Sequence, residues 1–412
     1  MAKSYQEKSV ELYGSIKEVF GWQTMYQQEY ALASMHSITR EFREEIAYAT
    51  TKLGNLYTKV INILQQANEE VLDMLGIPPE AWPTIRVPVF QHIVTSIGRF
   101  DFAQTKQGLK MLEFNSDTPT SVVEAFYVNA RACTYYHSQN PNAGMEAHLT
   151  QAFQDIVKKY IELGYPTETI VFSSLGWHEE DRGTTEYLLH QSGLNAKFVP
   201  LEELRVYEDR LCYCNQEGLY TPIDIWYRLH ALEKLAEEKD EVDQYPTGAH
   251  VLDLVSRKKL ALINPPSAFL AQSKAVQALI WNLHEAGEFF EPEEHEVIEK
   301  YMLPTYLENR FLDKRPHVSK PLFGREGGAI RLFSKNGDLI AQDNEANYWE
   351  QPMVYQEMVD LEDIEIETLS GLYKGKALWG SFLIGGQASG IGLRVGELIT
   401  GNLSYFLPVG YK

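Results

Sequence analysis

Apolar and polar residues alternate strictly between residues 99 and 115, the period of a β-strand with one buried face. The apolar positions are Phe100, Phe102, Leu112 and Phe114. Between the two runs, a loop of three residues that ends in Gly108 suits a type I turn closed by a left-handed residue. The pattern therefore predicts a β-hairpin in which Thr105 pairs with Leu109.

This register places two acids opposite each other, on the face away from the aromatic rings. Asp101 faces Glu113, and Arg99 faces Asn115. Two carboxylates directly across a strand pair repel each other. A magnesium ion would offset the repulsion, because Mg²⁺ is bound by one or two carboxylates together with nucleotide phosphates. Arg99 alone, acting in a structural ion pair, explains the arrangement equally well.

The first part of the chain predicts helices. Residues 1 to about 76 are rich in Glu, Gln, Leu and Tyr, and prolines at positions 78, 79 and 83 break that region. After the hairpin, Thr118 and Pro119 begin a further helical segment. Another helix is expected from about Met145 to Leu163.

From about residue 168 the pattern becomes α/β. Strands are expected at 168–175, at 195–200, around Leu211 and Ile225, and at 261–266. Helices are expected at 180–193, 250–260 and 273–287, the first and third of which end at glycine. After Tyr306 the chain is mostly β, with a glycine loop between two strands and a glycine-punctuated β region at the end.

Composition narrows the function classes. The 412 residues carry a net charge of −20, which argues against a general nucleic-acid surface. The charge is compatible with a cationic partner such as a polyamine, although acidity alone favours a role in solubility. An odd number of cysteines (Cys133, Cys212 and Cys214) without a C-x-x-C pair argues against a disulfide framework. The chain has no apolar signal core and no apolar run long enough to span a membrane, so a cytoplasmic location is expected.

A candidate phosphate site lies in "SKPLFGREGGAI", where Lys320 precedes the glycine loop. The glycines are Gly324, Gly327 and Gly328. They let main-chain N–H groups form an anion-binding nest, although many glycine-rich hairpins are only tight turns. The segment is neither a Walker loop nor a Rossmann fingerprint. Lys274 begins an amphipathic helix. The neighbours of Arg394 are apolar residues or glycine, so the charge of Arg394 needs a phosphate or a structural carboxylate as partner.

Several segments together resemble the glutathionylspermidine synthase family, in its ATP-grasp synthetase domain. These segments are "RFDF", "MLEFNSDTPTS", "SKPLFGREGGAI", "VYQEM" and "GIGLRVGELITGN", and the resemblance runs from about Arg99 to Pro408. It implies an α/β (α+β), ATP-grasp-like fold with a permuted motif order. Residues 1–98 would be an N-terminal helical region of the synthetase, and residues 99–412 the ATP-grasp-like region. The latter would contain a substrate-side α/β subdomain at about 168–260 and a nucleotide-binding, β-rich lid subdomain at about 261–412.

The resemblance implies an ATP- and Mg²⁺-dependent carboxylate–amine ligase that forms an amide through an acyl phosphate. The candidate substrates are glutathione or another acid, and spermidine or another amine. Only about 98 residues precede Arg99, without a convincing Cys/His hydrolase pattern, so the amidase domain of bifunctional members is expected to be absent. The alternative is a catalytically inactive protein that binds a nucleotide or a polyamine.

The family's functional residues fall on named positions of this chain. The metal ligands are Asp101, Glu113 and Asn115, and Arg99 would stabilise the transferring phosphoryl group. The nucleotide residues are Lys274, Lys320, Gly324, Gly327, Gly328, Gln356, Glu357 and Arg394. The acid-substrate residues would be Ser116, Thr118, Thr120 and Ser121. Glu179 and Glu180 would hold an ammonium group, or would simply be acids favoured at a helix N-terminus.

Overall fold

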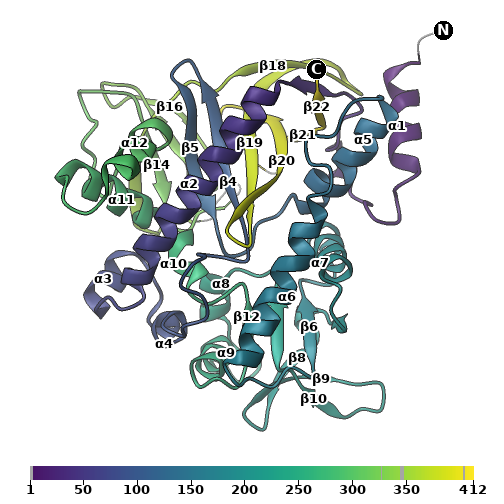
Figure 1. Cartoon of the computed structure of the whole chain (residues 1–412), viewed down its shortest axis with the longest axis vertical. Helices are drawn as coiled ribbons and strands as arrows, with labels where there is room; N and C mark the ends of the chain where they lie inside the picture. Colours follow the sequence, from purple (N-terminus) through teal and green to yellow (C-terminus); the bar gives the residue numbers. More distant parts are fainter. Residues whose placement is uncertain (1–2, 326, 344–347, 402–403) are drawn as a thin grey trace.

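The computed structural model describes residues 3–325, 327–343, 348–401 and 404–412. Within this part of the chain, three larger sheets form the framework, and a long helix, α2 (Arg40–Leu64), crosses the central one (Figure 1). The fold is mixed α/β, as the sequence predicts. No helix among the described residues is long and apolar enough to cross a membrane.

The central sheet joins segments that are far apart in the sequence. Its strand order is β21-β20-β19-β4-β5, and β18 pairs with β19. The strands are β4 (Ile97–Thr105), β5 (Gly108–Asn115), β18 (Asp363–Thr368), β19 (Gly371–Ile384), β20 (Gln387–Gly396) and β21 (Tyr405–Leu407). Helix α2 packs closely on this sheet, and the Oγ atoms of Thr50 and Ser381 lie 2.6 Å apart. Asp101 of β4 pairs with Gly380 of β19, so the next strand, β20, brings Arg394 close to the hairpin.

The hairpin confirms the predicted register at its functional end and corrects it at the turn. Asp101 pairs with Glu113, and Arg99 pairs with Asn115. Thr105 pairs with Gly108, however, so the loop has two residues and the predicted pairing of Thr105 with Leu109 is wrong. The register shifts at a β-bulge beside Asp101, which leaves one extra residue on β5.

The bulge also corrects the expected apolar face. Phe100, Phe102 and Phe114 are buried, but Met111 pairs with Phe102 and takes the core position predicted for Leu112. Leu112 lines a cleft instead. A local insertion of one residue therefore moves one apolar side chain to the opposite face, because the side-chain period of a strand is two.

The N-terminal region is only partly helical. Helices α1 (Tyr5–Gly14), α2 and α3 (Glu69–Met74) confirm the prediction, and η1 (Pro79–Ala81) and α4 (Trp82–Ile85) follow. Residues 15–39 are not helical: they form turns and the short strands β1 (Thr24–Met25), β2 (Gln28–Glu29) and β3 (His36–Ile38). Strand β3 pairs with β22 (Val409–Tyr411) at the opposite end of the chain, a long-range pairing that overrides local propensity.

The second sheet is parallel, with strand order β12-β11-β6-β7. Its strands are β6 (Ile170–Ser173), β7 (Ala196–Phe198), β11 (Ile225–Arg228) and β12 (Ala261–Ile263). The surrounding elements are η2 (Glu124–Val128), α5 (Asn129–Tyr135), α6 (Glu146–Glu162), α7 (Glu179–Ser192), η3 (Leu201–Glu203), α8 (Leu232–Glu237) and α9 (Thr247–Ser256). A small sheet of β8 (Leu204–Tyr207), β9 (Arg210–Cys214) and β10 (Tyr220–Pro222) lies beside them. The expected strands and helices of this region are confirmed, and the three cysteines are free thiols.

The third sheet carries the glycine loop between two of its strands, as predicted. Its order is β13-β17-β14-β15-β16. The strands are β13 (Thr305–Tyr306), β14 (His317–Pro321), β15 (Arg331–Phe333), β16 (Leu339–Gln342) and β17 (Met353–Glu357). Helices α10 (Ala268–Gln272), α11 (Lys274–Ala286) and α12 (Pro292–Tyr301) connect it to the second sheet. The predicted domain boundaries stay a prediction.

Candidate functional site

One cleft collects most of the residues singled out from the sequence. It lies between the hairpin β4–β5, strand β20, strands β14 and β17, and the glycine loop. The predicted residues that line it are Arg99, Asp101, Glu113, Asn115, Thr118, Thr120, Lys274, Lys320, Gly324, Gly327, Gly328, Gln356, Glu357 and Arg394. Elements separated by almost 300 residues thus contribute to a single site.

The paired acids of the hairpin are surrounded by cations. Asp101 is 1% exposed, and its oxygens accept hydrogen bonds from Arg99 Nε at 2.6 Å and Arg99 Nη2 at 3.0 Å. Arg394 Nη2 donates to Asp101 Oδ2 at 2.7 Å, so the partner that Arg394 requires is a carboxylate in this structure. Lys274 Nζ lies 3.3 Å from Glu113 Oε2. The repulsion expected between the acids is therefore offset by three cations rather than by Arg99 alone.

These contacts shift the ionisation of the cleft. Burial alone would raise the pKa of Glu113, but Lys274, Lys320 and the nearby arginines outweigh burial and hold that pKa below its ordinary value. Burial lowers the pKa of the Lys320 ammonium to about 8. Glu113 is thus ionised at neutral pH, and the ammonium of Lys320 is poorly solvated because it is buried.

Strands β14 and β17 form one side of the cleft. Lys320 Nζ donates to Gln356 Oε1 at 2.7 Å and to the Leu112 carbonyl at 3.2 Å, and Gln356 Nε2 donates to the same carbonyl at 3.3 Å. Glu357 accepts from Arg315 Nη1 at 2.7 Å. Apolar side chains complete this wall: Val318, Leu332, Met358, Val359, Leu361 and Leu378. An apolar slot beside a few polar groups suits a planar base.

The glycine loop approaches the cleft closely, and only small residues fit there. Gly327 has a φ of +78°, and a Cβ on it would lie 2.8 Å from the Thr400 carbonyl oxygen. Lys274 Nζ donates to the Gly324 carbonyl at 2.9 Å, which anchors the start of the loop. Sequence reasoning missed Arg325, which also lines the cleft, although a cation between the glycines of "GREGG" was a visible signal.

The candidate acid-substrate residues divide into two groups. Thr118 and Thr120 line the cleft, and the Thr120 carbonyl accepts from Arg99 Nη1 at 2.7 Å. Ser116 and Ser121 do not line it. The Ser116 hydroxyl donates to the Ala268 carbonyl at 2.7 Å, which is a structural contact.

Glu179 and Glu180 stand in the first turn of α7, outside the lining of the cleft. Glu179 lines a separate groove together with Trp22 and Arg182. This placement agrees with the alternative stated from the sequence, in which acids are favoured at a helix N-terminus.

The donor set at the hairpin fits magnesium. Asp101, Glu113 and Asn115 offer carboxylate and amide oxygens, which hard divalent cations prefer. The Asn115 amide nitrogen lies 3.5 Å from Asp101 Oδ2 and 3.4 Å from Glu113 Oε1, so the three side chains converge. Among the described residues no group of three or more His, Cys, Asp or Glu side chains is placed to hold a metal.

The family model described as glutathionylspermidine synthase preATP-grasp matches residues 5–411. A putative acid–amine ligase from Haemophilus influenzae is 26% identical over 322 residues, which cover 76% of this chain and 73% of the relative. The bifunctional glutathionylspermidine synthetase/amidase of Escherichia coli is 24% identical, over 84% of this chain and 56% of its own length.

Two further comparisons concern a more distant relative and the fold. Trypanothione synthetase from Crithidia fasciculata is 23% identical over 84% of this chain, which spans about half (52%) of that protein. A glutathione synthetase-like effector from Globodera pallida superposes with a TM-score of 0.59 at 12% identity, covering 100% of this chain and 98% of that structure. The latter likeness confirms the expected ATP-grasp-like fold.

Proposed function

The chain belongs to the glutathionylspermidine synthase family of acid–amine ligases, and on that premise we propose that it joins a carboxylate to an amine at the expense of ATP and with Mg²⁺. In this reaction ATP phosphorylates the acid to an acyl phosphate, and the amine then displaces phosphate to form an amide. The observation that carries the proposal is the convergence in one cleft of the hairpin acids, the cations Lys274, Lys320 and Arg394, and the glycine loop.

The residues of the cleft have separate roles in this proposal. Lys320 and the main chain of the glycine loop bind phosphates, and Gln356 and Glu357 meet the base at the apolar wall. Arg99 faces the transferring phosphoryl group, where a preorganised cation stabilises developing charge. Asp101, Glu113 and Asn115 would hold Mg²⁺, which when bound neutralises charge on the phosphates.

Thr118 and Thr120 line the cleft, where Thr118 contacts Arg325 and Thr120 contacts Arg99, and they would receive the acid. The names of the relatives suggest the substrates to try first, which are glutathione as the acid and spermidine as the amine. The same ligation reaction would also accommodate another peptide or acid as the acid substrate and another amine as the amine substrate.

Formation of ADP and phosphate should require both an acid and an amine, and chelation of Mg²⁺ by EDTA should stop it. Mass spectrometry of products from pooled acids and amines would identify the amide. Asp101→Ala and Glu113→Ala should each lower turnover by about 100- to 1,000-fold, because loss of one group that stabilises a transition state costs about 2.7–4 kcal/mol in comparable enzymes.

Unchanged turnover in both variants would contradict the assigned metal site. A shift of the melting temperature by Mg-ATP without turnover for any pair would instead favour the inactive binding protein, because any ligand of the native state stabilises it by mass action.

A further inference from the structure

Glu233 is a buried acid to which the proposed reaction assigns no part. It stands in the first turn of α8 and is 5% exposed. A buried carboxylate needs a partner, because an isolated charge is strongly disfavoured away from water. Its partner is Arg325, which belongs to the glycine loop on the other side of the cleft.

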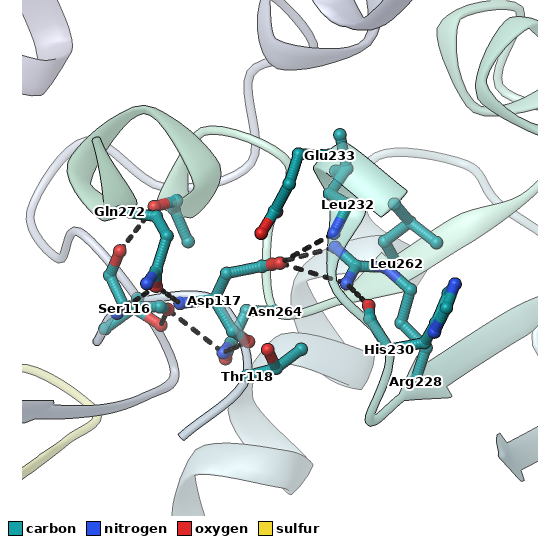
Figure 2. A network of polar contacts seen from close by, with 12 residues as sticks. Ser116, Asp117, Thr118, Arg228, His230, Leu232, Glu233, Leu262, Asn264 and Gln272 are labelled. Atoms are coloured by element: carbon teal, nitrogen blue, oxygen red, sulfur yellow. Dashed lines mark hydrogen bonds and ion pairs between the residues drawn. The ribbon is translucent and has the colours of Figure 1, made fainter. Parts of the chain in front are cut away.

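The position of Glu233 is fixed by a second buried ion pair. Arg228 donates to both carboxylate oxygens of Asp117, at 3.0 and 2.8 Å, and these two side chains are almost completely buried. The main-chain N–H of Leu232, the residue before Glu233, donates to the same carboxylate at 3.4 Å. Figure 2 shows the Asp117 carboxylate joined by dashed lines both to Arg228 and to Leu232 at the start of α8, with Glu233 nearby. The beginning of α8 is therefore tied to the chain segment that follows the hairpin.

Arg325 uses all three guanidinium nitrogens across the cleft. Its Nε lies 3.1 Å from Glu233 Oε1, its Nη2 lies 3.5 Å from Glu233 Oε2, and its Nη1 donates to Thr118 Oγ1 at 2.7 Å. Burial would lower the pKa of Arg325, and the charge of Glu233 more than compensates, so the guanidinium stays charged. Thr118 is one of the two cleft residues that would receive the acid.

We propose that Glu233 is a positioning residue, which holds Arg325 across the cleft onto Thr118 and so couples the position of this loop residue to completion of the acid end of the site. The inference rests on the proposed function, because it takes Thr118 as part of the acid site. An ion pair with a purely structural role would stabilise the protein without controlling the loop.

Hydrogen exchange of the glycine loop tests the proposal without any turnover. The Glu233→Gln substitution keeps the size of the side chain and removes its charge. In this variant, peptides spanning residues 321–330 should exchange about tenfold faster than in the parent protein. A factor of ten corresponds to about 1.4 kcal/mol of lost pairing free energy. Peptides from α2 should exchange as before. Glu233→Asp, which keeps the charge and shortens the side chain, should give an intermediate rate and serves if the glutamine variant does not fold.

The matched control is Asp224→Asn. Asp224 is also a buried acid, 8% exposed and paired with Arg210 at 2.9 Å, but it does not line the cleft. This variant should lower the melting temperature and leave exchange of the loop unchanged. Equal exchange of the loop in the Asp224 and Glu233 variants would overturn the proposal.

A double variant tests whether Glu233 acts through Arg325. In an Arg325→Gln background, adding Glu233→Gln should produce no further increase in exchange, and a further increase would overturn the coupling. With glutathione and spermidine as the first substrates, Glu233→Gln should raise KM for glutathione more than it lowers kcat. If no turnover is found for any pair, the proposed function fails while the exchange results still decide the role of Glu233 in the loop.

Discussion

Replacing Lys320 with methionine should remove nucleotide binding without destabilising the fold. Lys320 is 6% exposed, and burial lowers the pKa of its ammonium from 10.5 to about 8. This difference corresponds to about 3 kcal/mol by which the folded protein disfavours the charged form at neutral pH. Methionine is similar in length and uncharged, so the variant recovers this free energy. It loses the hydrogen bonds to Gln356 and the Leu112 carbonyl. Gln356 Nε2 still donates to that carbonyl, so the main cost is the loss of the donor to Gln356 Oε1, about 1–3 kcal/mol.

The effect of Lys320 on the free energy of unfolding should also depend on pH. Because the pKa of Lys320 is lower in the folded state, the unfolded chain binds more protons between about pH 8 and pH 10.5. The stability contribution of this lysine therefore rises with pH across that window. The advantage of Lys320→Met over the parent protein should be largest below pH 8 and should shrink toward pH 10.5.

The free energy of unfolding is measured by urea unfolding at several pH values. Nucleotide binding is measured by the shift of the melting temperature on adding Mg-ATP. The expected result is an unfolding free energy at pH 7 equal to or above that of the parent, together with loss of the Mg-ATP shift. A variant destabilised by more than about 2 kcal/mol at pH 7 would show that the lysine stabilises the empty fold. A full Mg-ATP shift would show that it does not bind phosphate. Either outcome would refute the reasoning.

Two further substitutions test the loop and its anchor. Lys274→Met removes the donor to the Gly324 carbonyl and the cation beside Glu113. We expect kcat to fall about 100-fold with little change in KM for the acid. A change confined to KM would contradict this. Gly327→Ala forces a Cβ to within 2.8 Å of the Thr400 carbonyl at a φ of +78°, and KM for ATP should rise about tenfold. Gly108→Ala is its control, because Gly108 also has a positive φ but nothing within 4 Å of its Cβ, so only stability should fall; equal effects on KM would point to backbone strain alone.

The sequence predicted the functional end of the hairpin because the two-residue period determines which side chains share a face. Asp101 and Glu113 pair as expected. The turn was mispredicted because one bulged residue shifts the pairing beyond Asp101, and no local pattern distinguishes a bulge from a longer loop. The same bulge directs the Leu112 carbonyl to Lys320 and Gln356, a polar contact that an alternating pattern does not predict.

Other parts of the site depend on contacts that lie far apart in the chain. Residues 15–39 read as helical from composition, but β3 finds its partner in the last strand, near Val409. Ser116 was assigned to substrate with its neighbours, whereas its hydroxyl is bonded to the Ala268 carbonyl. The sequence pattern does not single out Glu233, because its role depends on the ion pair with Arg325, which is about 90 residues away in the chain. Motifs whose residue types and spacing are both characteristic can be recognised in the sequence. Single residues that act through a distant partner can be recognised only in the structure.

From the charges that line the cleft we predict that nucleotide and metal bind cooperatively. The Lys and Arg residues that line it are Arg99, Lys274, Lys320, Arg325 and Arg394, whereas the acids are Asp101, Glu113 and Glu357. In a chain of net charge −20 this local excess of cations is unusual, and two of the cations contact the proposed metal ligands: Arg394 contacts Asp101, and Lys274 contacts Glu113. A triphosphate would take over these cations and free both carboxylates for Mg²⁺.

Such coupling is reciprocal, so the nucleotide should raise metal affinity by the same factor as the metal raises nucleotide affinity. Titration of Mn²⁺ in place of Mg²⁺, with and without a non-hydrolysable ATP analogue and corrected for binding of the two in free solution, measures it. We expect a gain of about tenfold or more, which corresponds to about 1.4 kcal/mol. In Arg394→Gln the gain should be smaller, because Asp101 is then less strongly held before the nucleotide arrives. Independent binding of metal and nucleotide would mean that the arginines and Asp101 form a permanent structural cluster rather than the resting state of a catalytic site.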